Sequence, residues 1–223
     1  VSEFTRKTVI TKYNQSSSKV VCIHNGVEPQ NCNKKIEDNI FGKTIVSFIG
    51  RVTYQKGPDY FVEAAAKVLE KDRNFVFVMA GDGDMLDKMT ALVAKKRISE
   101  NFFFTGFLKP DELKQLLAET SVFVMPSVSE PFGIAPLEAM SSGVAAVISR
   151  QSGVSEVLTH AIKVDFWDID AMSDAIYSIG RHKALSDMLC EKGKAEVAAL
   201  TWDKAADKLS ELYNQIANKT PQI

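Results

Sequence analysis

The feature that most constrains the fold is a regular alternation of short apolar runs and helix-like segments, which begins near Thr44 and continues to about residue 180. The runs have strand length and are apolar at every position, as in Phe75-Val-Phe-Val-Met-Ala80. Strands of that kind are buried on both faces, and the segments between them are long enough for helical crossovers. The sequence therefore predicts a doubly wound α/β domain, with a parallel sheet covered by helices.

The expected elements follow from this pattern and its punctuation. We expect strands at residues 45–49, 75–80, 102–104, 122–125 and 144–148, and a weaker one at 161–164. We expect helices at residues 58–71, 84–97, 135–142, 170–179, 184–200 and 202–217, and one that opens at Pro110. Pro58 suits a first helical turn, and Thr201 suits an N-cap. The polar region before residue 43 has one apolar run, 20–23, which predicts a single strand followed by a linker.

Composition excludes several classes of protein. The 223 residues include 27 Lys and Arg and 28 Asp and Glu, so the net charge of −1 gives no global field for nucleic acid or anionic lipid. No apolar run approaches the ~20 residues of a membrane span, and no signal peptide is evident. The chain has three cysteines, Cys22, Cys32 and Cys190, an odd number without the spacing typical of metal ligands. This predicts reduced thiols and a cytoplasmic location. Because the chain begins at Val1 rather than Met, we expect a piece of a longer protein.

Ligands of doubly wound sheets bind where loops leave the carboxyl ends of the strands. The loop after the first strand holds Gly50, Arg51, Lys56 and Gly57. Glycine lets a ligand approach the backbone closely, an Arg fork and a Lys charge suit phosphate oxygens, and the next helix points its positive end the same way. This loop predicts a diphosphate site, with a solvated turn as the alternative.

The loops after the second and third strands carry weaker signals. Gly81-Asp82-Gly83 half-matches a dinucleotide fingerprint, but Leu86 replaces the third glycine and the acids would repel a pyrophosphate, so a tight turn with Asp84 near the N-cap is favoured. After the third strand, Gly106 permits close approach, and Phe107 or Leu108 could flank a flat base. A turn with two core side chains is the alternative there.

The loop after the fourth strand is the most informative stretch. Glu130 lies in it, and Phe132-Gly133-Ile134 lead into a helix that contains Glu138. The backbone N–H groups of that lead-in can face an anion, and each carboxylate can accept hydrogen bonds from paired hydroxyls of a ribose or a hexose. The alternative is that Glu138 complements the helix dipole and Glu130 is solvated.

Two further features are ambiguous or negative. The Ser152-Gly153 turn after the fifth strand could contact a sugar or a phosphate, or could be a plain connection. His24, His160 and His182 have no partners at metal-ligand spacing, so we predict no metal site.

Taken together, Gly50-Arg51…Lys56-Gly57, Gly81-Asp82-Gly83, Phe104-Thr105-Gly106 and Glu130-Pro131-Phe132-Gly133…Glu138 resemble the carboxyl-terminal half of a glycosyltransferase. The similar family is the large retaining group that includes sucrose synthase-like and mannosyltransferase-like enzymes, with the GT-B fold. The resemblance runs from about Val20 to the C-terminus and implies a Rossmann-like domain that binds a nucleotide-sugar donor, with no cofactor and no metal.

The resemblance also implies roles for individual residues. Arg51 and Lys56 would hold the donor diphosphate, and Glu138 would bind the ribose hydroxyls. Glu130 would contact the transferred sugar as a hydroxyl binder rather than a nucleophile. The remaining implied contacts come from backbone: Gly50, Gly106, Leu108 at the base, and the amides of Phe132, Gly133 and Ile134.

The implied domain plan has three parts. Residues 1–43 would end the amino-terminal acceptor domain and form the linker, 44–200 would bind the nucleotide sugar, and 201–223 would form a helix crossing back, with a tail. The implied partner is that acceptor domain, without nucleic acid; the full-length protein could reach membranes through surfaces of the other half. The loop Ser152-Gly153-Val-Ser-Glu156 departs from the family's Gly-Gly-x-x-Glu pattern.

Three other functions stay open. A nicotinamide-dependent oxidoreductase would need a full fingerprint after the first strand, where this chain has cations instead. A non-catalytic nucleotide-sugar sensor would keep the pocket and lose turnover. A phosphorylase or epimerase shares the fold, although no lysine site for a phosphorylase cofactor is evident.

Overall fold

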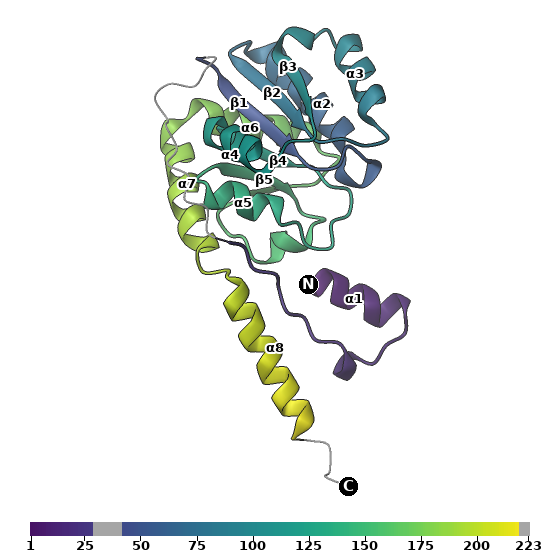
Figure 1. Ribbon diagram of the computed structural model, residues 1–223. Helices are drawn as coiled ribbons and strands as arrows, with labels where there is room; N and C mark the ends of the chain where they lie inside the picture. The colour runs from purple at the N-terminus through teal and green to yellow at the C-terminus, as the bar shows by residue number, and fades with distance from the viewer. Residues whose placement is uncertain (29–41, 219–223) are drawn as a thin grey trace.

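The computed structural model describes residues 1–28 and 42–218 and has one six-stranded sheet at its centre (Figure 1). The strands lie in the order β3-β2-β1-β4-β5-β6, and every neighbouring pair is parallel. This confirms the predicted doubly wound α/β domain. The strand bounds are β1 (Thr44–Ile49), β2 (Phe75–Ala80), β3 (Phe102–Gly106), β4 (Val122–Met125), β5 (Ala145–Ser149) and β6 (Ile162–Val164).

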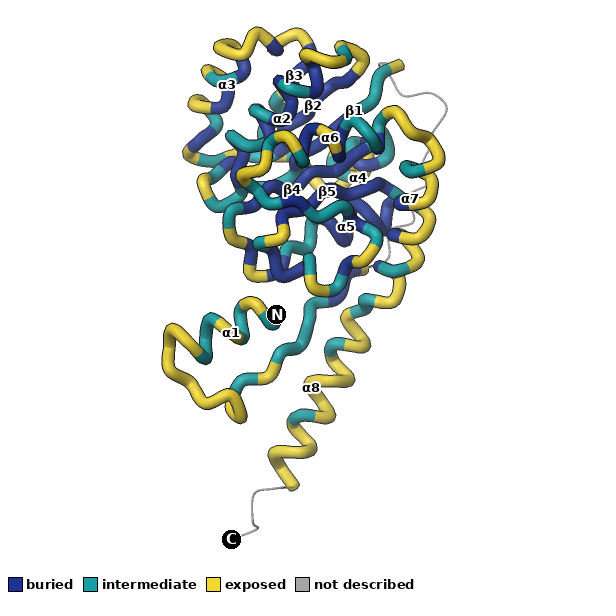
Figure 2. Tube along the Cα trace, turned by 180° about the vertical axis from the view of Figure 1, so that it is seen from behind, coloured by how far each residue is buried: buried dark blue, intermediate teal, exposed yellow. Residues whose placement is uncertain are grey.

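Helices cover both faces of the sheet because alternate strand residues point to opposite sides. On one face, Phe48 and Phe77 pack with α2 (Pro58–Lys71), α3 (Leu86–Lys95) and α6 (Ile169–Arg181). On the other, Phe123 and Ile148 pack with α4 (Pro110–Glu119) and α5 (Ala135–Ser141). Helix α7 (Lys183–Val197) contacts both α5 and α6. The buried residues in Figure 2 concentrate in this layered part of the molecule.

The strand order reverses between β1 and β4. The chain moves outward from β1 to β2 and β3, and then returns to the other side of β1 for β4. The chain therefore continues from β1 and from β4 to helices on opposite faces of the sheet, and ligands of such folds bind in the crevice at this reversal. The described residues also form the 3₁₀ turns η1 (Ser17–Lys19), η2 (Tyr54–Lys56), η3 (Ser99–Asn101) and η4 (Gly153–Glu156).

Both ends of the chain extend beyond the carboxyl edge of the sheet (Figure 1). Helix α8 (Trp202–Ala217) has the predicted bounds, and the Thr201 side chain caps it by accepting a hydrogen bond from the Lys204 amide at 3.3 Å. Helix α1 (Glu3–Lys12) was not predicted; its N-cap is Ser2, whose hydroxyl accepts from the Thr5 amide at 3.0 Å.

The strand predicted at residues 20–23 is wrong. This segment is irregular, and no described strand runs beside it to supply the inter-strand hydrogen bonds that a β-strand needs. The helix predicted at 84–97 is shorter, because residues 83–86 form a turn in which the Leu86 amide donates to the Gly83 carbonyl at 3.1 Å. Asp84 lies near the N-cap as predicted, directly before Met85, which holds the N-cap position.

The predicted linker and Cys32 fall largely or wholly outside the described residues, whereas Cys22 and Cys190 are free thiols. None of the helices in the described ranges is long and apolar enough to cross a membrane.

Candidate functional site

The loop after β1 is shaped by glycines at both ends. Gly50 has φ 151°, and a Cβ there would meet nothing within 4 Å, so the backbone conformation and not crowding requires glycine. Gly57 has φ 64°, and a Cβ there would lie 2.2 Å from the carbonyl oxygen of Pro126. Between them, the Lys56 amide donates to the Thr53 carbonyl at 2.9 Å. The loop therefore folds back against the chain that follows β4.

Hydrogen bonds tie the loops after β1 and β4 together. The Val128 amide donates to the Gln55 carbonyl at 2.9 Å, and the Gln55 side chain donates to the Ser129 carbonyl at 2.9 Å. Next to these contacts, Lys56 Nζ forms an ion pair with Glu130 Oε2. Lys56, predicted to bind phosphate, and Glu130, predicted to bind sugar, therefore meet where the strand order of the sheet reverses.

The Glu130 backbone is held as firmly as its side chain. Its amide donates to the Gln151 carbonyl at 3.2 Å, and its carbonyl accepts from the Gly153 amide at 2.9 Å. Residue Glu130 is 8% exposed. Because the backbone is bonded on both sides to the loop after β5, the carboxylate has little freedom to leave its place.

A cavity of about 310 Å³ opens beside this ion pair. The cavity is lined by Lys56, Glu130 and the predicted lead-in residues Phe132, Gly133 and Ile134. Among the described residues, the amides of these three lead-in residues have no hydrogen-bond acceptor. Three unpaired N–H groups in a cavity wall can bind an anion or a hydroxyl oxygen.

A second cavity, of about 300 Å³, shares Ile49 with the first. It is lined by Gly50, Arg51, Asp82, Phe107 and Leu108, together with Leu113 and other apolar groups. Arg51 is exposed and has no ion pair or side-chain hydrogen bond within the described part of the chain. Phe107 is 81% exposed, which leaves its ring free to stack on a flat group.

Two predicted residues do not line either cavity. Gly106 ends β3 in the left-handed region, with φ 68°, and its carbonyl accepts from the Gly81 amide at 2.8 Å. Glu138 is half-buried on α5, one turn after Ile134, and its carboxylate has no hydrogen-bond partner among the described residues. Burial raises the pKa of the Glu138 carboxyl above its ordinary value near 4.5. The other eight predicted site residues line the two cavities.

The cavity walls also contain residues that the sequence did not single out. Ser127 is fully buried in the wall of the first cavity, and its hydroxyl has no hydrogen-bond partner among the described residues. Asn25 reaches the same wall from the amino-terminal segment. Asn25 and Gly26 form a dipeptide typical of turns, and nothing in the local sequence indicates which surface such a turn contacts.

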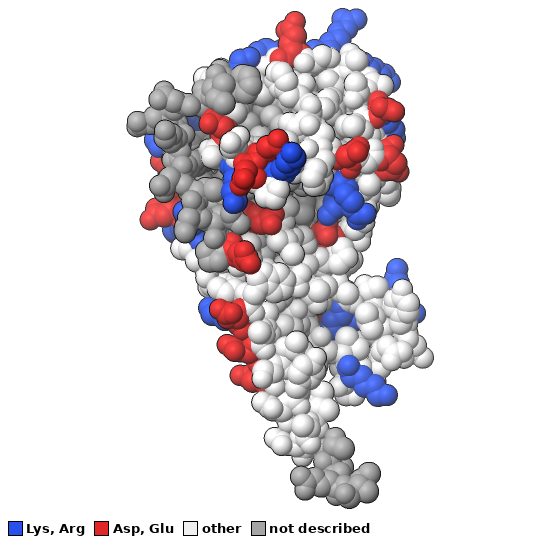
Figure 3. Space-filling model, viewed as in Figure 1, with Lys and Arg blue, Asp and Glu red and all other residues white. Residues whose placement is uncertain are grey.

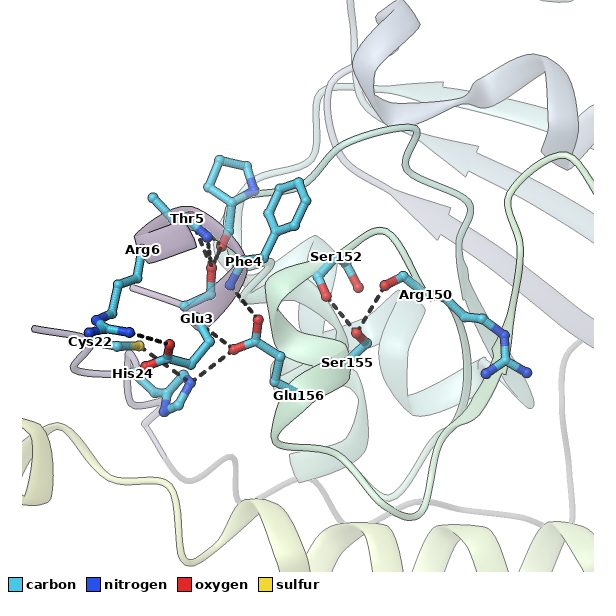
Figure 4. A network of polar contacts seen from close by, with 12 residues as sticks. Glu3, Phe4, Thr5, Arg6, Cys22, His24, Arg150, Ser152, Ser155 and Glu156 are labelled. Atoms are coloured by element: carbon cyan, nitrogen blue, oxygen red, sulfur yellow. Dashed lines mark hydrogen bonds and ion pairs between the residues drawn. The ribbon is translucent and has the colours of Figure 1, made fainter. Parts of the chain in front are cut away.

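The amino-terminal segment is anchored by Glu156, at the end of η4 (Figure 4). Its carboxylate accepts from the amides of Glu3 and Phe4, at 2.8 and 2.6 Å, and lies 3.2 Å from His24 Nε2. Burial would raise the pKa of Glu156, but the hydrogen bonds from these two amides and from His24 outweigh it, so the pKa is lowered. The sequence indicated Glu156 only as the last residue of the loop 152–156, and it did not predict His24 as a partner of Glu156.

Within residues 1–28 and 42–218, no three His, Cys, Asp or Glu side chains gather closely enough to hold a metal ion. His160 bonds Glu196 of α7 through Nδ1 at 3.1 Å, which gives it a structural contact.

Comparison with known proteins identifies the family to which this chain belongs. Residues 31–196 match the family model described as glycosyl transferases group 1. An uncharacterized glycosyltransferase of Methanocaldococcus jannaschii is 34% identical over 96% of this chain and 58% of its own length. An Escherichia coli relative, UDP-Gal:alpha-D-GlcNAc-diphosphoundecaprenol alpha-1,3-galactosyltransferase, is 28% identical over 90% of this chain and 56% of its own.

Among solved structures, Anabaena HepE in complex with UDP and glucose superposes with a TM-score of 0.85 at 16% identity, over 96% of this chain and 62% of HepE. That likeness concerns the fold, which is of the GT-B type. The chain spans about half the length of these curated relatives.

Proposed function

Because this chain belongs to the group 1 glycosyl transferases, we propose that it forms the donor-binding part of a retaining glycosyltransferase. The enzyme would transfer a sugar from a nucleoside diphosphate sugar to an acceptor. The observation that carries this proposal is the pair of adjoining cavities where the strand order reverses. Arg51 lines one cavity, and Lys56, Glu130 and three amides that have no acceptor among the described residues line the other.

The two cations suit the leaving group. When the bond between the sugar and the terminal phosphate breaks, negative charge grows on the phosphate oxygen. Arg51 and Lys56 can stabilise that charge, and the amides of the lead-in to α5 can support the phosphate or the sugar. These groups compensate the charge within the protein, so we propose that the reaction needs no metal.

The remaining proposed contacts are with the transferred sugar at one end of the donor and with the nucleoside at the other. Glu130 would accept hydrogen bonds from hydroxyls of the transferred sugar, and Glu138 would accept them from the ribose. Phe107 and Leu108, in the second cavity, would flank the base. Arg51 lines the same cavity and would bind the phosphates between the two ends.

We propose uridine as the base and retention as the stereochemical course. The Escherichia coli relative is named for UDP-Gal as donor and for an alpha-1,3 linkage as product. Sugar nucleotides such as UDP-galactose carry the sugar in α linkage, so an α-linked product means that configuration is retained.

The acceptor domain would lie outside these residues, beside α8 and the amino-terminal segment. A groove of about 750 Å³ between them is lined by apolar side chains that include Val21, Ile23, Leu209 and Ile216. Figure 3 shows acidic side chains along one edge of α8 and an uncharged surface over the rest of its visible face.

We propose the domain boundaries 1–43, 44–200 and 201–223. The free thiols of Cys22 and Cys190 suit a reducing compartment, and we propose the cytoplasm.

Calorimetric titration of the 223-residue chain with UDP, GDP, ADP and NAD tests this proposal. We expect UDP to bind, and Arg51→Ala and Glu138→Ala each to weaken it by roughly tenfold or more, because each removes one charged contact. Arg73→Ala and Glu191→Ala are matched controls, since both residues are exposed and line neither cavity.

Binding of NAD in preference to every diphosphate would contradict the proposal, as would equal affinities in the site and control variants. The chain alone is expected to bind the donor but not to transfer sugar, because the acceptor side of the site would come from the other domain. Turnover of UDP-galactose by these residues alone would overturn that division of labour.

A further inference from the structure

Among the residues that the structure describes, the charged side chains that line the two cavities sum to no net charge. They are Arg51, Lys56, Asp82 and Glu130, with two charges of each sign. Lys56 is already paired with Glu130, and Asp82 accepts a bond from its own turn. A site for a multiply charged anion would bind more tightly without the carboxylate of Glu130, so its presence needs an explanation.

The Glu130 carboxylate must lie close to any anion that Lys56 binds. The Glu130 side chain is 10% exposed and that of Lys56 is 22% exposed, so both lie largely within the wall. The hydrogen bonds of the Glu130 backbone to Gln151 and Gly153 hold the carboxylate at the cavity. Any phosphate that reaches the Lys56 ammonium group therefore comes close to a fixed negative charge.

The sugar-nucleotide donor and the nucleoside diphosphate product differ in the charge on the terminal phosphate, and a nearby carboxylate interacts differently with the two. Transfer breaks the bond between the anomeric carbon and the terminal phosphate oxygen, and that oxygen keeps the electron pair. The acceptor oxygen forms the new bond to the anomeric carbon, and its proton passes to the released phosphate or to solvent. The freed phosphate gains an ionisable oxygen with a pKa of about 6, so it carries about one further charge at neutral pH. The intact donor instead presents sugar hydroxyls, which donate hydrogen bonds to a carboxylate.

We propose that Glu130 makes the site discriminate against the sugar-free nucleoside diphosphate and so favours its exchange for a fresh donor. This inference rests on the proposed function and adds a specificity role to it. While the sugar is attached, the carboxylate contacts hydroxyls. Once the sugar has left, the same carboxylate faces an additional phosphate charge, and repulsion weakens product binding.

A purely structural role makes a different prediction. If Glu130 only positioned Lys56, its removal would misplace the cation and weaken every diphosphate ligand by a similar factor. A charge that senses the terminal phosphate changes the ratio of two affinities instead, so the ratio separates the two roles.

The experiment compares three probes by calorimetry at neutral pH: UDP, its terminal methyl ester and UDP-galactose. The methyl ester removes the ionisable oxygen without adding a sugar. In Glu130→Gln we expect UDP to gain affinity relative to the methyl ester by roughly fivefold or more, because unit charges a few ångströms apart interact appreciably even under partial screening. UDP-galactose should lose affinity relative to the methyl ester.

Two companion variants keep the result interpretable. Glu130→Asp retains the charge and should keep the wild-type ratio of UDP to methyl ester affinities. Glu138→Gln should weaken UDP and the methyl ester equally, because both carry the same ribose. An unchanged ratio in Glu130→Gln, with all three probes still binding, would overturn this inference and leave the proposed function intact. Failure of the wild-type chain to bind any of the probes would overturn the proposed function, and the inference with it.

Discussion

A Cβ atom on Gly57 would lie 2.2 Å from the carbonyl oxygen of Pro126, closer than two such atoms can approach. Gly57 also has φ 64°, which disfavours any L side chain. Gly57→Ala should therefore destabilise the chain by about 2–3 kcal/mol, combining backbone strain with a displaced loop. Because Lys56 precedes Gly57, the variant should also lose affinity for UDP. Urea unfolding and calorimetry measure the two effects.

Gly143→Ala is the matched control for Gly57→Ala. Gly143 has φ 78°, but a Cβ there would meet nothing within 4 Å. Its substitution should cost about 1 kcal/mol from backbone conformation alone and leave UDP binding unchanged. Equal losses of stability in the two variants would show that the approach of the two loops is not the constraint.

The layered fold was predictable because its signals are local. The run Phe75–Ala80 is apolar at every position, and the observed β2 has the predicted bounds. The loops after β1 and β4 could be assigned to one edge because carboxyl ends of parallel strands meet there. The ion pair of Lys56 and Glu130 could not be predicted, since it joins residues 74 positions apart and depends on how two loops fold.

The amino-terminal segment shows the opposite case. Helix α1 has no buried residues and almost no segregation of apolar side chains to one face, so no helical periodicity marks it. Its contacts with the domain are hydrogen bonds to Glu156 and to the Pro131 carbonyl, which have no signature in a sequence. The four apolar residues 20–23 suggested a strand, but a strand forms only where a neighbour completes its hydrogen bonds.

The Glu156 contact makes the attachment of α1 dependent on pH. Because hydrogen bonds hold the pKa of Glu156 below its ordinary value of 4.5, the folded state favours the ionised form. The stabilisation is thus present above the unfolded pKa and is lost as the pH falls through the lowered folded pKa. Amide hydrogen exchange in α1, relative to that in the core strands, should therefore accelerate as the pH falls below 4.5.

Substitution of the same side chain should reproduce this effect at neutral pH. Glu156→Gln keeps the shape but replaces charged acceptors by one neutral oxygen, so the amides of Glu3 and Phe4 should exchange several-fold faster. The core strands should keep their protection. Glu191→Gln, on an exposed part of α7, serves as the control. If α1 exchanges alike in both variants, Glu156 is not its anchor.

Donor binding should release a proton from Glu138. Burial raises the pKa of Glu138 above 4.5, so without ligand the carboxyl stays protonated to a higher pH than an exposed one, and its contribution to stability falls as the pH rises through that raised value. Ribose hydroxyls donate to the ionised form and lower the pKa again. Affinity for UDP-galactose, which does not titrate here, should therefore weaken as the pH falls from 7 towards 4.5.

Calorimetry in buffers of different ionisation enthalpy measures this proton release directly. The release should disappear in Glu138→Gln, whose affinity should no longer follow pH in this range. A pH dependence that persists in Glu138→Gln would assign the titration to another group and remove Glu138 from the ribose site.

The junction of Gly26 with α8 provides a last test, of how the two ends of the chain are joined. A Cβ at Gly26 would lie 2.3 Å from the backbone carbon of Thr201 and from the Trp202 nitrogen, and the next amide, of Val27, donates to the Leu200 carbonyl at 2.9 Å. Gly26→Ala should force these segments apart and destabilise their contact by about 1–3 kcal/mol. Hydrogen exchange should then rise in α8 while β1 to β5 stay protected, and the exposed neighbour change Glu28→Ala should have no effect. Because Asn25 lines the first cavity, UDP affinity should fall with the Gly26 substitution as well. If α8 exchanges as in the unsubstituted chain, this close approach does not hold the helix in place.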